Sequence, residues 1–87
     1  MYSYEKEKER IFTQEGMKDF IKVRDHVIRV LKTSGVIDMG HAMSVVTGDS
    51  WYMMALVDHM VVMGDIYEVK HENCCWAQHR IFVRCGE

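Results

Sequence analysis

The amino-acid sequence predicts an α+β domain that is mainly helical, with three helices followed by a two-stranded β-hairpin. Apolar residues recur at three- and four-residue spacing between residues 14 and 63, and glycines stand where these patterns end. After Gly64 the sequence turns to β-branched and aromatic residues, which favour strands. The 87 residues form one domain at most, and their 48% hydrophobic content is typical of globular proteins. We expect a charged N-terminal extension over residues 1–12 and the folded domain over residues 13–87.

The N-terminal extension alternates in charge and offers two tyrosines for burial, so we expect a frayed segment or a short solvated helix. The first long helix is predicted over residues 14–33. Thr13 can cap its first N–H groups, and Gly35 can end it in the left-handed conformation. Its inward stripe is expected to contain Met17, Phe20, Ile21, Val27, Ile28 and Leu31.

Two further helices are predicted over residues 39–46 and 51–63. Asp38 is expected to cap the first of them. The stretch "TGDS" then forms a turn, in which Gly48 permits a positive φ and Asp49 or Ser50 caps the next helix. Gly64 ends that helix. Its inward stripe is expected to contain Met53, Leu56, Val57, Met60 and Val61.

The hairpin is predicted over residues 66–83, from "DIYEVK" and "AQHRIFVRC" with a loop between them. In its second strand Ile81 and Val83 share one face of the sheet, and Arg80, Phe82 and Arg84 share the other. We expect Phe82 on the outward face.

The stretch "TGDSWYMMALVDHMVVMGDIYEV", followed by "QHRIFVR", resembles the winged helix-turn-helix superfamily, in particular small bacterial and phage-type members. The resemblance covers residues 13–85. It implies binding to double-stranded DNA through the third helix and the wing, by a homodimer that regulates transcription or a mobile element. The positions that the resemblance assigns to DNA are Ser50, Trp51, Tyr52, Ala55, His59, Lys70, His71, His79, Arg80 and Arg84.

The charge distribution departs from that family pattern. No Arg or Lys lies between Ser50 and Met63, so no guanidinium there can read a guanine. Residues 36–87 hold three basic and seven acidic side chains, a net charge of −4 that opposes phosphate binding. The alternative is a winged-helix module for protein–protein interaction or dimerisation, without nucleic acid. Its candidate contact residues are Trp51, Tyr52, Val62, Met63, Trp76 and Phe82.

Other chemistry has weaker support in the sequence. The residues His71, Cys74, His79 and Cys85 could hold a metal ion, but their spacing matches no established signature, and we expect no cofactor. The sequence contains no glycine-rich phosphate loop and no H-E-x-x-H motif, so we do not expect an enzyme. No apolar run is long enough to span a bilayer, and the three cysteines are an odd number without a secretory leader. We therefore expect a cytoplasmic protein without membrane contact.

Overall fold

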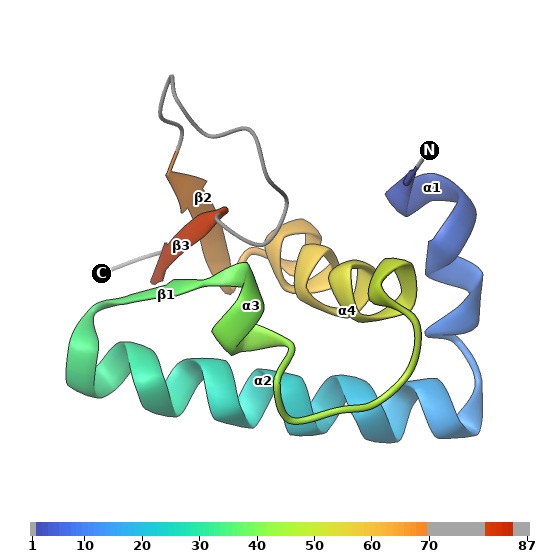
Figure 1. Ribbon diagram of the computed structural model, residues 1–87, viewed down its shortest axis with the longest axis horizontal. Helices are drawn as coiled ribbons and strands as arrows, with labels where there is room; N and C mark the ends of the chain where they lie inside the picture. Colours follow the sequence, from blue (N-terminus) through green and yellow to red (C-terminus); the bar gives the residue numbers. More distant parts are fainter. Residues whose placement is uncertain (1, 70–79, 85–87) are drawn as a thin grey trace.

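The computed structural model describes residues 2–69 and 80–84, in which helices pack on one face of a small antiparallel sheet (Figure 1). The chain is α+β and mainly helical, as predicted. The elements in chain order are α1 (Tyr4–Glu7), η1 (Lys8–Arg10), α2 (Gln14–Ser34), β1 (Val36–Asp38), α3 (Met39–Ala42), α4 (Ser50–Met63), β2 (Ile66–Val69) and β3 (Ile81–Arg84). None of the helices in this described part is both long and apolar enough to cross a membrane.

The capping residues set the ends of α2 as predicted. The Thr13 side chain accepts a hydrogen bond from the Gly16 N–H at 2.9 Å, and Gly35 takes the left-handed conformation at φ 80°. The inward stripe is narrower than predicted, because Met17 and Ile21 are exposed and Val23 is completely buried instead. The buried positions follow one line along the helix. A residue that directly follows a buried one is rotated by about 100° around the helix axis, so it lies outside that line. That line consists of Gly16, Phe20, Val23, Val27 and Leu31.

The second predicted helix is shorter than expected. Asp38 caps α3 by accepting a hydrogen bond from the His41 N–H at 2.7 Å, but α3 ends at Ala42 and not at residue 46. The Ser44 hydroxyl donates to the His41 carbonyl at 2.7 Å, and such local bonds compete with continuation of a helix.

Helix α4 closely matches its predicted bounds. Asp49, not Ser50, is its cap and accepts a hydrogen bond from the Tyr52 N–H at 2.9 Å. Gly64 ends the helix at φ 88°, in the left-handed region that favours glycine.

The sheet has three strands in the order β1-β3-β2, with both pairings antiparallel. The hairpin of β2 and β3 was predicted from the sequence. Residues 36–38 were expected only to link the predicted helices on either side of them. These residues instead form β1, in which Ile37 lies opposite Phe82. Three residues are too few to display an alternating pattern, and the partner strand lies far along the chain, so β1 was not detectable from local sequence.

The predicted orientation of the last strand is wrong. Phe82 is completely buried and faces the helices, together with Ile37 and Ile66 from the neighbouring strands. Ile81 and Val83 therefore point to the opposite, outer face of the sheet. The reason is packing, because the largest side chain of the strand fills the space between the sheet and the helices.

Candidate functional site

Helix α4 lies at the centre of the described molecule and is apolar on nearly all sides. It packs against α2, α3, β2 and the N-terminal elements α1 and η1. A helix that is hydrophobic all round is expected to be buried. Leu56, Val57 and Met60 are buried as predicted, whereas Met53 and Val61 are only partly buried. The full set of its buried residues is Tyr52, Met54, Ala55, Leu56, Val57, His59 and Met60.

The N-terminal segment covers one side of α4. The Tyr2 hydroxyl donates to Asp58 Oδ2 at 2.5 Å, and the Tyr4 hydroxyl lies 2.7 Å from His59 Nδ1. Residue Ile11 is completely buried in the core. The short helix expected as one alternative is present as α1, with exposed charged side chains and a Lys8–Glu5 pair. The expectation of a frayed segment is wrong, because the contacts of Tyr2, Tyr4 and Ile11 dock the segment on α4 (Figure 1).

Arg10 makes a further contact at the start of α4. Its two terminal nitrogens donate to the Asp49 carboxylate at 3.2 and 2.6 Å, and its guanidinium lies 4.9 Å from the centre of the Tyr52 ring. The hydrogen bonds from Arg10 are the main cause that lowers the pKa of Asp49 to about 2. The carboxylate is therefore ionised at neutral pH.

The packing around α4 buries several of the residues that the resemblance assigns to DNA. Tyr52, Ala55 and His59 are at most 8% exposed, so their side chains cannot reach a base edge from the structure as folded. Their prediction as exposed contact residues is wrong, because α2 and the N-terminal segment pack over them. Ser50 and Trp51, in the first turn of α4, are exposed as predicted.

His59 is surrounded by aromatic rings from α1, from α2 and from the segment between η1 and α2. Its ring centre is 6.3 Å from that of Tyr4, 5.5 Å from that of Phe12 and 4.8 Å from that of Phe20. Burial lowers the pKa of His59, while the negative charge of Asp65 acts weakly in the opposite direction. The neutral imidazole is thus the form that this site favours.

Arg80, directly before β3, forms an ion-pair network with side chains from β2 and α4. Its guanidinium donates to Asp58 Oδ1 at 2.7 Å and to Glu68 Oε1 at 3.0 Å. A guanidinium held by two carboxylates is not available to a phosphate, so its predicted role in DNA binding is not supported by its position. Arg84 is exposed. The other predicted wing residues, Lys70, His71 and His79, lie outside the described residues.

Some of the candidate interface residues are exposed in the structure, and others are buried. Trp51, Val62 and Met63 are exposed, with Val62 and Met63 at 64% and 63%. Tyr52 and Phe82 belong to the core, so their prediction as interface residues is wrong. Trp76 lies outside the described residues.

An apolar surface that the sequence analysis missed lies on the outer face of the sheet. Cross-strand register places Val36, Val83 and Tyr67 in one row, and Asp38, Ile81 and Val69 in the next. We define the outer sheet face as the five apolar residues of these rows. Antiparallel sheets with one solvated face usually carry polar residues there. Tyr67, Val36 and Val69 are nevertheless 52%, 45% and 36% exposed.

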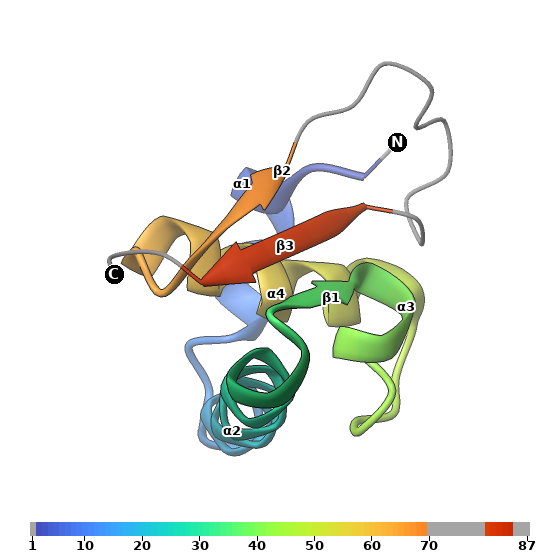
Figure 2. The same cartoon turned by 90° about the vertical axis from the view of Figure 1, so that its left-hand side faces the viewer.

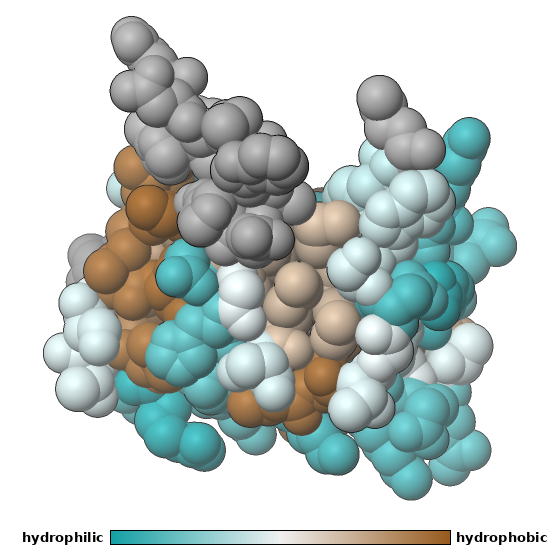
Figure 3. All heavy atoms as spheres, viewed as in Figure 1, coloured by the Kyte–Doolittle hydropathy of each residue, from teal (hydrophilic) through white to brown (hydrophobic). Residues whose placement is uncertain are grey.

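The views of the molecule agree with this assignment. Figure 2 shows the three strands in front of α4, and no helix of the described chain lies in front of them. In the space-filling view, hydrophobic residues gather at the left, over the sheet (Figure 3). The outer sheet face is therefore open to a partner molecule in the part of the chain that the structure describes.

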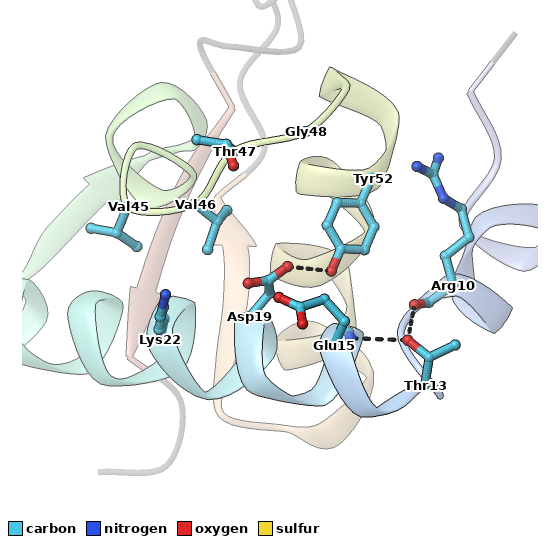
Figure 4. Close-up of a pocket in the computed structure, with 11 residues that line it drawn as sticks. Arg10, Thr13, Glu15, Asp19, Lys22, Val45, Val46, Thr47, Gly48 and Tyr52 are labelled. Atoms are coloured by element: carbon cyan, nitrogen blue, oxygen red, sulfur yellow. Dashed lines mark hydrogen bonds between the residues drawn. The ribbon is translucent and has the colours of Figure 1, made fainter.

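A cleft of about 560 Å³ lies on another side of the molecule, between the start of α2, residues 45–48 and the start of α4 (Figure 4). The Tyr52 hydroxyl points into α2 and donates to Asp19 Oδ2 at 2.6 Å. Burial is the main cause that raises the pKa of Tyr52, and this hydrogen bond adds to it. Glu15 and Lys22 also line the cleft and are exposed. Its charges are mixed and solvated, an arrangement that selects no particular ligand.

The four candidate metal ligands, His71, Cys74, His79 and Cys85, lie outside the described residues. Within residues 2–69 and 80–84, no group of three or more His, Cys, Asp or Glu side chains is placed to hold a metal ion.

Comparison of the chain with protein-family models, with curated proteins and with solved structures gave no match.

Proposed function

We propose that this chain is a protein-interaction module of the winged helix-turn-helix type, which associates with a second copy of itself through the outer sheet face. The order of α2, α3 and α4 followed by β2 and β3 supports the winged-helix part of the proposal, and β1 adds a third strand. The observation that carries the functional part is the exposure of apolar residues on both rows of the outer sheet face.

A second copy is the partner that this face fits. Two-fold association places the same patch of each copy against the other, so a patch rich in one charge would repel itself. The five residues of the outer sheet face are uncharged, and Asp38 lies beside them at one corner of the sheet. The outer sheet face can therefore meet itself without a large electrostatic cost.

The size of the patch indicates a weak dimer. Burying the exposed part of one such side chain contributes on the order of 1 kcal/mol. Ten side chains in two copies then contribute roughly 10 kcal/mol, against an association cost of about 4 to 15 kcal/mol. We expect association that depends strongly on protein concentration.

Sedimentation velocity over roughly a hundredfold concentration range tests the proposal. We expect the wild-type chain to move from monomer to dimer, and Tyr67→Lys to remain a monomer because it places an ammonium group in the apolar contact. Ile21→Lys is the matched control, since Ile21 is 55% exposed on α2. A wild-type chain that stays monomeric, or a Tyr67→Lys chain that dimerises like it, would contradict the proposal.

DNA binding is the competing function, and the described residues favour it less. Helix α4 contains no Arg or Lys, part of its surface is covered, and Arg80 is held by two carboxylates. Fluorescence anisotropy of a labelled random duplex at several salt concentrations separates the two functions. Binding that weakens steeply with salt would report phosphate contacts and favour DNA, whereas our proposal predicts no such binding.

A further inference from the structure

The side of α4 that the N-terminal segment covers has the chemistry of a binding surface. The ring face of Tyr52 lies beneath the segment, under the Arg10 guanidinium, while its hydroxyl donates to Asp19 on α2. The polar groups beneath the segment are the carboxylate of Asp58 and the imidazole of His59. Asp49 stands at the start of the same helix. These groups are polar and can be hydrated, so uncovering them is less costly than uncovering an apolar core.

The segment itself is held mainly by its docking on α4. α1 has four residues and η1 has three, far fewer than an isolated helix needs to be stable in water. Within residues 2–12, Ile11 is completely buried, whereas Tyr2 and Tyr4 are partly buried and Arg10 is exposed. The hydrogen bonds of Tyr2 and Tyr4 are partly buried and those between Arg10 and Asp49 are exposed, so the segment opens at a lower free energy than the completely buried core.

The anchor of the segment lies at Ile11. A Cβ atom at Gly16 would overlap the carbonyl oxygens of Arg10 and Ile11, so glycine lets the chain pass close over the start of α2. Residues 2–10 extend from this anchor along α4. We call these nine residues the N-terminal cover.

We propose that the covered side of α4 is a peptide-binding surface and that the N-terminal cover is its tethered, displaceable occupant. The partner is a short segment that presents tyrosine hydroxyls to Asp58 and His59 and a guanidinium to Asp49, as the cover does. The negative charge of Asp49 disfavours phosphate at this surface, and the charge of Asp58 is balanced by Arg80. The surface is distinct from the outer sheet face, and the proposal does not depend on dimerisation.

A fluorescent peptide of residues 1–10, with an amidated C-terminus, tests the proposal by anisotropy with the full chain. In the wild-type chain the tethered cover has an effective concentration on the order of millimolar and excludes the peptide. Arg10→Glu in the chain breaks the contact with Asp49 and places like charges together. We expect this chain to bind the peptide at least tenfold more tightly than the wild-type chain does.

The matched control is Lys8→Glu, which makes the same charge change in the same segment. Lys8 pairs with Glu5 within the cover, so we expect its chain to exclude the peptide like the wild type. A peptide that itself carries Arg10→Glu is expected not to bind the opened chain.

The variant chains are first compared with the wild type by circular dichroism. If Arg10→Glu does not fold, Tyr2→Phe replaces it, because this change removes one hydroxyl that donates to Asp58 and leaves the ring. Equal binding, or none, to all folded chains would overturn the proposal. Sedimentation of the same chains shows whether dimerisation changes separately, since the two surfaces do not share residues.

Discussion

Replacing Arg80 with Gln removes the cation that lies between Asp58 and Glu68. The guanidinium donates to the two carboxylates at 2.7 and 3.0 Å, and the three side chains are 21%, 13% and 21% exposed. Breaking a buried ion pair from one side costs about 3 to 5 kcal/mol, because charge is left in a medium of low dielectric constant. Part of this network is solvated, so we expect a loss of about 2 to 3 kcal/mol.

This loss is a large fraction of the stability expected for a chain of this length, about 4 to 13 kcal/mol. At about 4 to 8 °C for each kcal/mol, it lowers the midpoint of thermal unfolding by roughly 10 to 20 °C. Circular dichroism during heating and urea titration measures both quantities. The m-value should stay constant if the change acts on the folded state.

Two further variants isolate the cause. Arg84→Gln removes an exposed cation from β3, the strand that directly follows Arg80, and is expected to change stability by less than about 0.5 kcal/mol. Adding Glu68→Gln to Arg80→Gln relieves the repulsion between the carboxylates, so the double variant should be more stable than the two separate losses predict. An Arg80→Gln chain that unfolds at the same temperature as Arg84→Gln would refute the structural role of Arg80.

Three other outcomes follow from the packing and the pKa shifts. Phe82→Ala should cost about 3 to 5 kcal/mol, and Val83→Ala much less, in urea titrations, because the first residue is completely buried and the second is not; equal losses would contradict the assigned faces of β3. Gly16→Ala should destabilise the chain in the same assay despite the better helix propensity of alanine, because its Cβ meets backbone carbonyls. The lowered pKa of His59 means that the unfolded chain binds its proton more readily, so stability should fall as the pH drops below about 6.5. Urea titrations at several pH values should show a smaller fall for His59→Leu, and an unchanged fall would contradict the effect of burial.

Local sequence was sufficient to predict the starts of α2, α3 and α4 and the ends of α2 and α4, but not the end of α3. Thr13, Asp38 and Asp49 accept hydrogen bonds from the first turns that follow them, and Gly35 and Gly64 take positive φ values where the apolar patterns stop. Each of these signals acts within a few residues, so a single sequence displays it.

The long-range features were not predictable in this way. β1 pairs with a strand more than forty residues away, and the orientation of Phe82 depends on the space that the helices leave. The position of Arg80 depends on two acidic residues from different elements. These arrangements arise from tertiary packing, which a local pattern does not encode.

The candidate surfaces were also only partly predictable from local sequence. α4 is apolar at most positions, so periodicity could not separate its inner side from the side that the N-terminal segment covers. Apolar residues at both alternating positions of β2, Ile66 and Tyr67 for example, were a signal of the outer sheet face that could have been used.

The enclosure of α4 also affects which changes the chain can accumulate over time. Almost every position from Tyr52 to Met60 contacts another element, so most substitutions there alter packing and are removed by selection. The exposed side of α2 is free of that constraint, whereas the outer sheet face is constrained by the proposed contact with a second copy. We therefore expect substitutions on that side of α2 to be tolerated, whereas a change in α4 lowers the stability of every surface that this helix supports.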